Sequence, residues 1–224
     1  MNLDVAVLVV AKAPVPGFAK TRLARDVGDA RAADLAAASL LDTLDAVTGA
    51  GVAQRVVAMT GDLGRAVRGT DIASALDCFT VLPQRGENFA ARLVNAHADT
   101  FDAFGLPILQ IGMDTPQVTA GLLAESADLL TERRGRCVLG PAEDGGWWIL
   151  GVPDAVATEA IGSVPTSSPD TGRLTREALL AAGAEVLSLP TLRDVDYATD
   201  VAPVAALCPE SSHFRREYLL TTGG

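Results

Sequence analysis

The chain has 224 residues, of which 49% are hydrophobic and 21% are charged, a composition typical of a globular fold. Its net charge of −10 disfavours a nucleic-acid partner, because such a partner requires a basic face. No run of 18 apolar residues and no secretory leader is visible, so we expect a cytoplasmic protein without a membrane span. The three cysteines are widely spaced and form no metal motif, so reduced thiols are expected, with Cys78 and Cys137 as small core residues.

Hydrophobic periodicity and turn residues predict alternating strands and helices. In chain order, the predicted elements are a strand at 5–10, a helix at 29–47, a strand at 55–60, a weak helix near 62–68, a strand at 79–82, a helix at 89–101, a strand at 107–111, a helix at 119–132, strands at 137–139 and 147–152, a helix at 171–182, a strand at 185–189 and a helical tail. Prolines leave 153–169 without an assignment. This alternation predicts a three-layer α/β/α sandwich with a mostly parallel sheet, as a single domain over 1–224.

Some single residues carry expectations of their own. Thr119 is a plausible N-cap of the helix that follows it, and Asp200 a cap of the tail helix. His97 lies on the apolar side of its predicted helix, so we expect a core histidine rather than a ligand.

The loop after the first strand contains Lys12, Lys20 and Arg22. Both lysines of the chain lie in this loop, whereas the other sixteen basic residues are arginines. Because a lysine ammonium is a compact partner for phosphate, the loop is a candidate polyphosphate site that includes Pro16 and Gly17. The alternative is a solvated basic loop. The predicted loop at 84–88 adds Gln84 and Gly86 as candidate phosphate contacts.

Carboxylates follow two other predicted strands. Asp114 comes directly after the strand at 107–111, and Asp194 and Asp196 follow the last strand. Two residues apart on extended chain, Asp194 and Asp196 share a face, so both could approach one Mg²⁺ or Mn²⁺ ion together with Asp114. The alternative is that these residues only form acidic turns. Which of Asp194 and Asp196 would be the second metal ligand is left open.

A fourth polar loop contains Glu143, Asp144, Gly145 and Gly146, and Trp147 follows it. The glycines would let the backbone come close to a ligand, and a tryptophan facing the pocket could stack on a base or a sugar, so this loop is a candidate acceptor site. Of Trp147 and Trp148, at least one is expected in the core. Ligands of open α/β sheets bind beyond the carboxyl ends of the strands, where all these loops are expected to meet.

Four segments resemble a family of small bacterial proteins described as glycosyltransferase-A-like, or as similar to the molybdenum cofactor guanylyltransferases. They span residues 11–23, 111–116, 139–151 and 192–196, in the family's order. The resemblance implies a nucleotide-diphospho-sugar transferase fold, a bound nucleotide and a divalent cation. The chain departs from the family at Met113 and Thr115, where serine and cysteine flank the aspartate, and at the tryptophan pair, where tyrosines are commoner. These departures bear on the choice of acceptor.

Two enzymatic functions compete. A nucleotidyltransferase moves NMP from an NTP to a small phosphorylated acceptor and releases pyrophosphate, with Lys20 and Asp114 as catalytic residues and cations on the leaving group. A glycosyltransferase would use an NDP-sugar and place more weight on Glu143 and Asp144, one of which could serve as the base. The cationic loop favours nucleotidyl transfer. A non-catalytic nucleotide-binding protein is a third possibility, and a homodimer is left open.

Overall fold

The computed structural model describes residues 2–222, except for the side chains of 155–157 and 221–222. Its centre is a seven-stranded sheet in the order β3-β2-β1-β4-β6-β5-β7. The strands are β1 (Leu3–Lys12), β2 (Val52–Thr60), β3 (Thr80–Pro83), β4 (Ile108–Gly112), β5 (Arg136–Pro141), β6 (Trp147–Val152) and β7 (Glu185–Ser188). Only β6 among them runs antiparallel to its neighbours β4 and β5. The mostly parallel sheet expected from the sequence is therefore confirmed.

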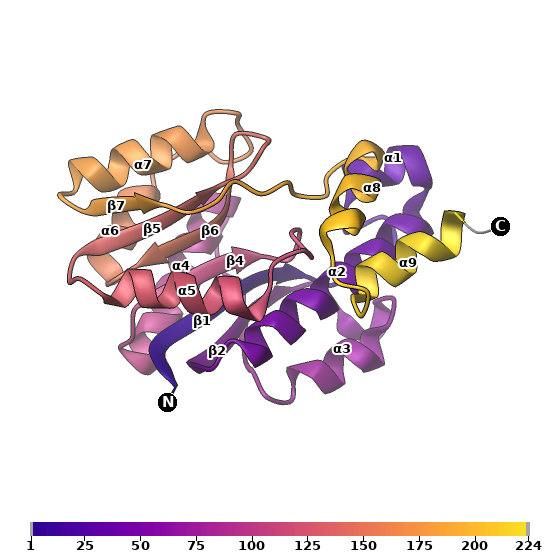
Figure 1. Ribbon diagram of the computed structural model, residues 1–224, viewed down its shortest axis with the longest axis horizontal. Helices are drawn as coiled ribbons and strands as arrows, with labels where there is room; N and C mark the ends of the chain where they lie inside the picture. The colour runs from indigo at the N-terminus through magenta and orange to yellow at the C-terminus, as the bar shows by residue number, and fades with distance from the viewer. Residues whose placement is uncertain (1, 223–224) are drawn as a thin grey trace.

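Helices cover both faces of the sheet (Figure 1). The helices are α1 (Thr21–Val27), α2 (Asp29–Gly49), α3 (Gly69–Leu76), α4 (Phe89–Phe104), α5 (Ala120–Thr131), α6 (Ala155–Ile161), α7 (Thr171–Ala181), α8 (Ala198–Leu207) and α9 (His213–Thr222), with a short 3-10 helix, η1, at Leu63–Arg65. Helices α2, α3 and α5 share one apolar cluster with the sheet, and α4, α6 and α7 share a second cluster on the opposite face. No described helix is long and apolar enough to cross a membrane.

The buried middle of β1 explains why its sequence is continuously apolar. Residues 5–9 are fully buried, because β1 pairs with β2 on one side and β4 on the other while helices cover both faces. The carboxyl end of β1 therefore opens at the middle of one sheet edge, with the ends of β2 and β4 beside it.

A third apolar cluster lies beside the sheet and is made by helices together with Val195 of the segment before α8. It joins α1 and the first half of α2 to α8 and α9, and includes Leu23, Val204 and Phe214. In Figure 1 the chain leaves β7, crosses the molecule to this cluster and enters α8. This crossing segment contains Asp194 and Asp196, so the last predicted carboxylates pass the sheet edge where β1 and β4 end.

Several sequence expectations were wrong. Cys78 is exposed in the turn after α3, because that turn points away from the sheet, whereas Cys137 is buried in β5 as expected. The helix expected near 62–68 is only the short η1, and the true helix, α3, begins at Gly69. Two helices were missed, α1 and α6, because both are only seven residues long and lie next to proline-rich segments.

Two capping expectations hold. Thr119 is the N-cap of α5 and accepts a hydrogen bond from the Leu122 amide. Asp200 lies in the first turn of α8 and not at its N-cap, but its carboxylate does cap the helix by accepting from the amides of Asp196 and Tyr197.

Candidate active site at the carboxyl edge of the sheet

A cavity of about 480 Å³ opens at the carboxyl ends of β1, β2 and β4. It is lined from β1, from the loops after β4 and β5, from the start of α4 and from the segment between α6 and α7. Of the candidate site residues expected from the sequence, the following line it: Lys12, Lys20, Arg22, Gln84, Asp114, Asp144, Gly146, Trp147, Asp194 and Asp196. The four polar loops thus meet at one site, as the strand order requires.

Lys20 lies between two of the predicted carboxylates. Its Nζ atom is 2.8 Å from Asp114 Oδ1 and 3.1 Å from Asp196 Oδ1, and the lysine side chain is only 9% exposed. Burial alone would lower the pKa of Lys20, but Asp114 and Asp196 outweigh it and raise the pKa. Arg22 pairs with the other oxygen of Asp196 at 2.7 Å. Lys20 and Arg22 are therefore already neutralised by carboxylates.

The backbone conformation of Lys20 directs its side chain toward Asp114 and Asp196. Lys20 has a left-handed conformation, with φ 51°, directly before the first residue of α1. Such a conformation is uncommon for a residue other than glycine and is found where the surrounding contacts enforce it. The turn before α1 thus sends the Lys20 side chain inward toward Asp114 and Asp196.

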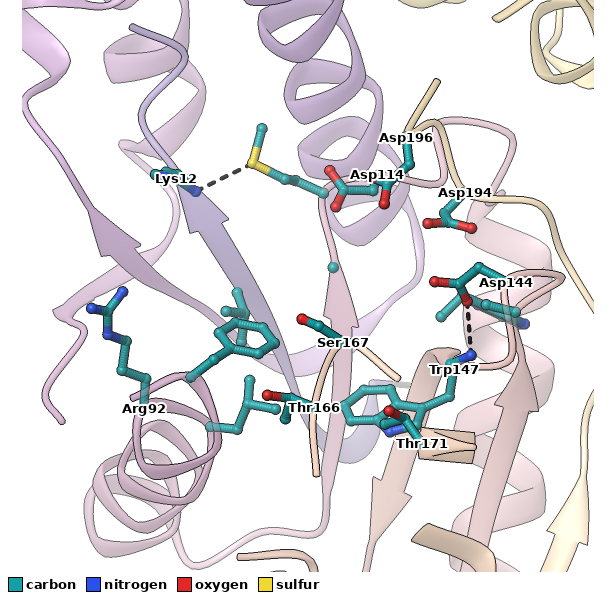
Figure 2. A pocket seen from close by; sticks show the side chains of 18 of the residues that line it. Lys12, Arg92, Asp114, Asp144, Trp147, Thr166, Ser167, Thr171, Asp194 and Asp196 are labelled. Carbon is teal, nitrogen blue, oxygen red and sulfur yellow. Dashed lines mark hydrogen bonds between the residues drawn. The ribbon is translucent and has the colours of Figure 1, made fainter. Parts of the chain in front are cut away.

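Lys12 and Arg92 are different, because no carboxylate pairs with either among the described residues. The Nζ atom of Lys12 lies 3.9 Å from the centroid of the Phe18 ring. Partial burial and the positive charge of Arg92 lower the pKa of Lys12. Figure 2 shows Lys12 and Arg92 on one side of the cavity and four aspartates on the other. Two like charges facing one cavity without counter-charge are suited to an anionic ligand.

Three of the aspartates form a compact group. Carboxylate oxygens of Asp144, Asp194 and Asp196 lie within 4.8 Å of one another. Burial and then the charges of Asp144 and Asp196 raise the pKa of Asp194 to about 6. In contrast, Lys20 and Arg22 outweigh the effect of burial on Asp196 and lower its pKa. Oxygen ligands at this spacing suit a hard divalent cation, which would also relieve the repulsion around Asp194.

Backbone hydrogen bonds hold the three acidic loops together. The Val195 amide donates to the carbonyl of Asp114 at 3.0 Å, which ties the crossing segment to the loop after β4. The Gly146 amide donates to Asp144 Oδ1 at 2.7 Å and orients that carboxylate within its own turn. These contacts fix the positions of Asp144 and Asp194 although both lie on loops.

Other residues that the sequence suggests as phosphate contacts are either exposed or make contacts within the fold. Pro16 and Gly17 are exposed in the turn before Lys20 and do not line the cavity. The side chain of Gln84 donates to the carbonyls of Ala11 and Ala58 at 2.8 and 2.9 Å, so it joins the ends of β1 and β2. Gly86 packs under α4, where a Cβ atom would come within 2.9 Å of the Arg92 amide nitrogen. Gly86 does not line the cavity, and its carbonyl accepts a hydrogen bond from Arg92 Nε at 3.4 Å.

The acceptor residues expected from the sequence separate into two groups. Glu143 and Gly145 face other loops: Glu143 pairs with Arg193 at 2.6 Å, and a Cβ on Gly145 would lie 2.0 Å from the Pro169 carbonyl oxygen. Asp144, Gly146 and Trp147 do line the cavity. Trp148 is the core member of the tryptophan pair, buried to 3% exposure.

Sequence reasoning missed several cavity residues. Arg92 and Gln110 were passed over because one is a single arginine on a helix and the other a polar residue within a strand. The segment between α6 and α7 was left unassigned, yet it contributes hydroxyl groups to the cavity, from Thr166, Ser167 and Ser168. A polar residue inside an otherwise apolar strand was the one signal that could have indicated Gln110.

Solved structures of other proteins share this arrangement of strands and helices. A protein of Desulfovibrio desulfuricans G20, provisionally described as a nucleotide-diphospho-sugar transferase, has a TM-score of 0.82 and 25% identity over 100% of this chain and 95% of that chain. CMP:2-keto-3-deoxy-manno-octonic acid synthetase in complex with CTP has a TM-score of 0.57 and 12% identity, covering 91% and 98% of the two chains. Rv0371c of Mycobacterium tuberculosis H37Rv in complex with manganese has a TM-score of 0.53 and 18% identity, covering 90% and 97%.

The fold is therefore that of the nucleotide-diphospho-sugar transferases, as expected from the sequence, and the expected transferase class agrees with the description of the Desulfovibrio protein. The chain belongs to the family described as "Uncharacterized protein conserved in bacteria (DUF2064)", whose model matches residues 43–168. No curated protein matches the chain in sequence.

Proposed function

We propose that the protein is a divalent-cation-dependent nucleotidyltransferase, which moves NMP from an NTP to a small-molecule acceptor and releases pyrophosphate. One observation carries this proposal: a single cavity has two unneutralised cations, Lys12 and Arg92, facing a cluster of three carboxylates. A triphosphate needs positive charge on its leaving phosphates and a cation near its α-phosphate, and the two sides of this cavity can provide both.

The residues of the chain have separate tasks in this proposal. Lys12 and Arg92 bind the β- and γ-phosphates and stabilise the charge that develops on the departing pyrophosphate. Asp144, Asp194 and Asp196 would hold Mg²⁺ or Mn²⁺, which supplies positive charge at the α-phosphate when bound. Lys20 keeps the Asp114 and Asp196 carboxylates at a fixed separation through its two ion pairs. This differs from the sequence-based expectation that Lys20 itself grips phosphate.

Two of the neighbours support the proposal. The synthetase named above contains CTP, and Rv0371c contains manganese. The Desulfovibrio protein, by its description, also supports the second candidate, transfer of a sugar from an NDP-sugar. Lys12 and Arg92 favour the triphosphate, because a diphosphate held by a divalent cation has less need of two further positive charges.

The experiment incubates the protein with Mg²⁺ or Mn²⁺, each NTP and a panel of acceptors, and measures pyrophosphate. We expect pyrophosphate release with one preferred base, and at least a tenfold loss of kcat/KM in Lys12→Met and Arg92→Met. Arg85→Met is the matched control, because Arg85 lies near the start of α4 but pairs with Asp99 outside the cavity. Turnover of NDP-sugars without pyrophosphate would overturn the proposal in favour of glycosyl transfer.

A further inference from the structure

The part of the cavity away from Lys12 and Arg92 has a different chemistry. Figure 2 shows Trp147, Thr166, Ser167 and Thr171 grouped below the aspartates. Of the described cations that line the cavity, Lys20 and Arg22 are paired with Asp196, while Lys12 and Arg92 lie on the opposite side. A second phosphate group would therefore meet aspartates and hydroxyl groups here, and no free positive charge.

Gln110 lies in the buried lining of this cavity, in the middle of β4, and is only 3% exposed. Its Oε1 atom is 2.7 Å from Nε2 of His97, a buried histidine of α4. Burial lowers the pKa of His97 to about 4, with the Gln110 hydrogen bond offsetting only part of this effect, so the ring is neutral near pH 7. Because an amide oxygen can only accept, His97 Nε2 must be the protonated nitrogen and the donor.

This hydrogen bond fixes the direction of the Gln110 amide. With Oε1 held by His97, the NH₂ group is turned away from the histidine, and no hydrogen bond from it to another described residue is found. This nitrogen is not among the described side-chain atoms that are fully buried without a partner, so it reaches the space of the cavity, where water or a ligand can accept its hydrogen bond. The cavity, which Gln110 lines, is where such an acceptor can bind.

The hydroxyl loop adds groups of the same character. Ser167 has a left-handed backbone, with φ 59°, an uncommon conformation for a residue other than glycine. No side-chain hydrogen bond of Thr166 or Ser167 is found within the described chain, whereas Thr171 donates to the Pro165 carbonyl. Together with the half-buried ring of Trp147, these groups offer neutral donors, neutral acceptors and one aromatic face.

We propose that this half of the cavity, formed by Gln110, Trp147, Thr166 and Ser167, binds a neutral polyhydroxylated acceptor such as a sugar or polyol, and that Gln110, positioned by His97, donates a hydrogen bond to it. The inference rests on the proposed function and replaces the phosphorylated acceptor expected from the sequence. In the reaction, an acceptor hydroxyl oxygen forms a bond to the α-phosphorus. The bond from that phosphorus to the bridging oxygen breaks, pyrophosphate leaves with the electron pair, and the hydroxyl proton passes to solvent.

Binding, not turnover, is the first test. The protein with Mg²⁺ and a non-hydrolysable α,β-methylene NTP is titrated with glucose, mannose, glycerol and myo-inositol, and with the monophosphate of each, by ligand-observed NMR. At least one neutral compound is expected to bind at least tenfold tighter than its monophosphate. Ser167→Ala and Gln110→Leu should each weaken binding of that neutral compound at least fivefold, and the Kd of the NTP analogue should not change. Thr100→Ser, a conservative change on α4 outside the cavity, should leave both affinities unchanged.

Each other outcome has a definite meaning. Tighter binding of a monophosphate, or no binding of any neutral compound while the NTP analogue binds, overturns the neutral acceptor and leaves the nucleotidyltransferase proposal standing. If Gln110→Leu is unfolded, Ser167→Ala at the exposed loop decides alone. Failure of the NTP analogue to bind, with a UDP- or GDP-sugar binding through the same residues, overturns the proposed function and makes the polyhydroxylated group the sugar of the donor.

Discussion

At the scale of single residues, the most informative side chain is Lys20. It is held between Asp114 and Asp196 at 2.8 and 3.1 Å, and the pair lies next to a group of carboxylates that suits a divalent cation. A positive charge at this position competes with a metal for Asp196, because both neutralise the same carboxylate. We therefore infer that Lys20 weakens metal binding in the resting protein while it keeps two carboxylates in place.

We therefore expect Lys20→Met to bind Mn²⁺ more tightly than the wild type, by about tenfold, since a tenfold change needs only ~1.4 kcal/mol of altered charge interaction. Turnover should nevertheless fall at least a hundredfold, because Asp114 loses its partner. Electron paramagnetic resonance of free Mn²⁺ measures the affinity, and Asp194→Asn is the control, with weakened Mn²⁺ binding. Weaker Mn²⁺ binding in Lys20→Met would show that the lysine does not compete with the metal.

At the scale of secondary-structure elements, the helical cluster of α1, α2, α8 and α9 positions one side of the site. Lys20 directly precedes α1, and Asp196 lies two residues before α8. Helices α1 and α8 meet in this cluster, where Leu23 is fully buried. Asp42 of α2 accepts hydrogen bonds from the amides of His213 and Phe214, so it caps α9 and holds the C-terminal helix against the cluster. The Lys20–Asp196 ion pair therefore depends on helix packing outside the sheet.

Two leucine truncations can separate this positioning role from simple stability. Leu23 and Leu123 are both fully buried, the first in the helical cluster and the second in the cluster between α5 and the sheet. Each change to alanine should lower the free energy of unfolding by about 3 kcal/mol, because each leaves a cavity. Only Leu23→Ala should also lower kcat, by roughly tenfold at a temperature where both variants are folded. Equal losses of kcat in the two variants would mean that the cluster acts through stability alone.

The sequence predicted those strands and helices that are long enough to show hydrophobic periodicity. Long buried strands and long helices were recognised, and β6 was placed residue for residue at 147–152. The helices α1 and α6 are each only seven residues long, too short to show a period, so they were missed. At the site, charged residues at strand ends were recognised because a parallel sheet places those ends together. Gln110 and Arg92 were not recognised, because their place in the site depends on side chains that only the tertiary structure brings close to them.

For the same reason, the ion pair between Lys20 and Asp196 could not be predicted from the sequence. The sequence shows a lysine in a basic loop, which suggests phosphate, but Asp196 is 176 residues further along the chain. Only the crossing segment, tied to Asp114 by the Val195 amide, brings that carboxylate to Lys20. The distinction between a free and a neutralised cation is therefore a property of the tertiary structure.

At the scale of the whole molecule, an acidic protein of net charge −10 directs two unpaired cations and a cluster of carboxylates into one cavity. The negative charge of the protein repels a free nucleotide, whereas a nucleotide neutralised by a divalent cation is repelled much less. Nucleotide and metal should therefore bind with strong positive coupling, which by linkage is the same whichever binds first. This coupling is the central claim of the proposed function.

The most direct measurement is calorimetric titration of the α,β-methylene analogue of the preferred NTP, with and without saturating Mn²⁺, into the wild type, Asp194→Asn and Lys12→Met. We expect at least tenfold tighter binding with Mn²⁺ in the wild type, loss of most of this gain in Asp194→Asn, and uniformly weaker binding with the gain retained in Lys12→Met. Equal affinity with and without Mn²⁺ in the wild type, or an unchanged gain in Asp194→Asn, would contradict this expectation.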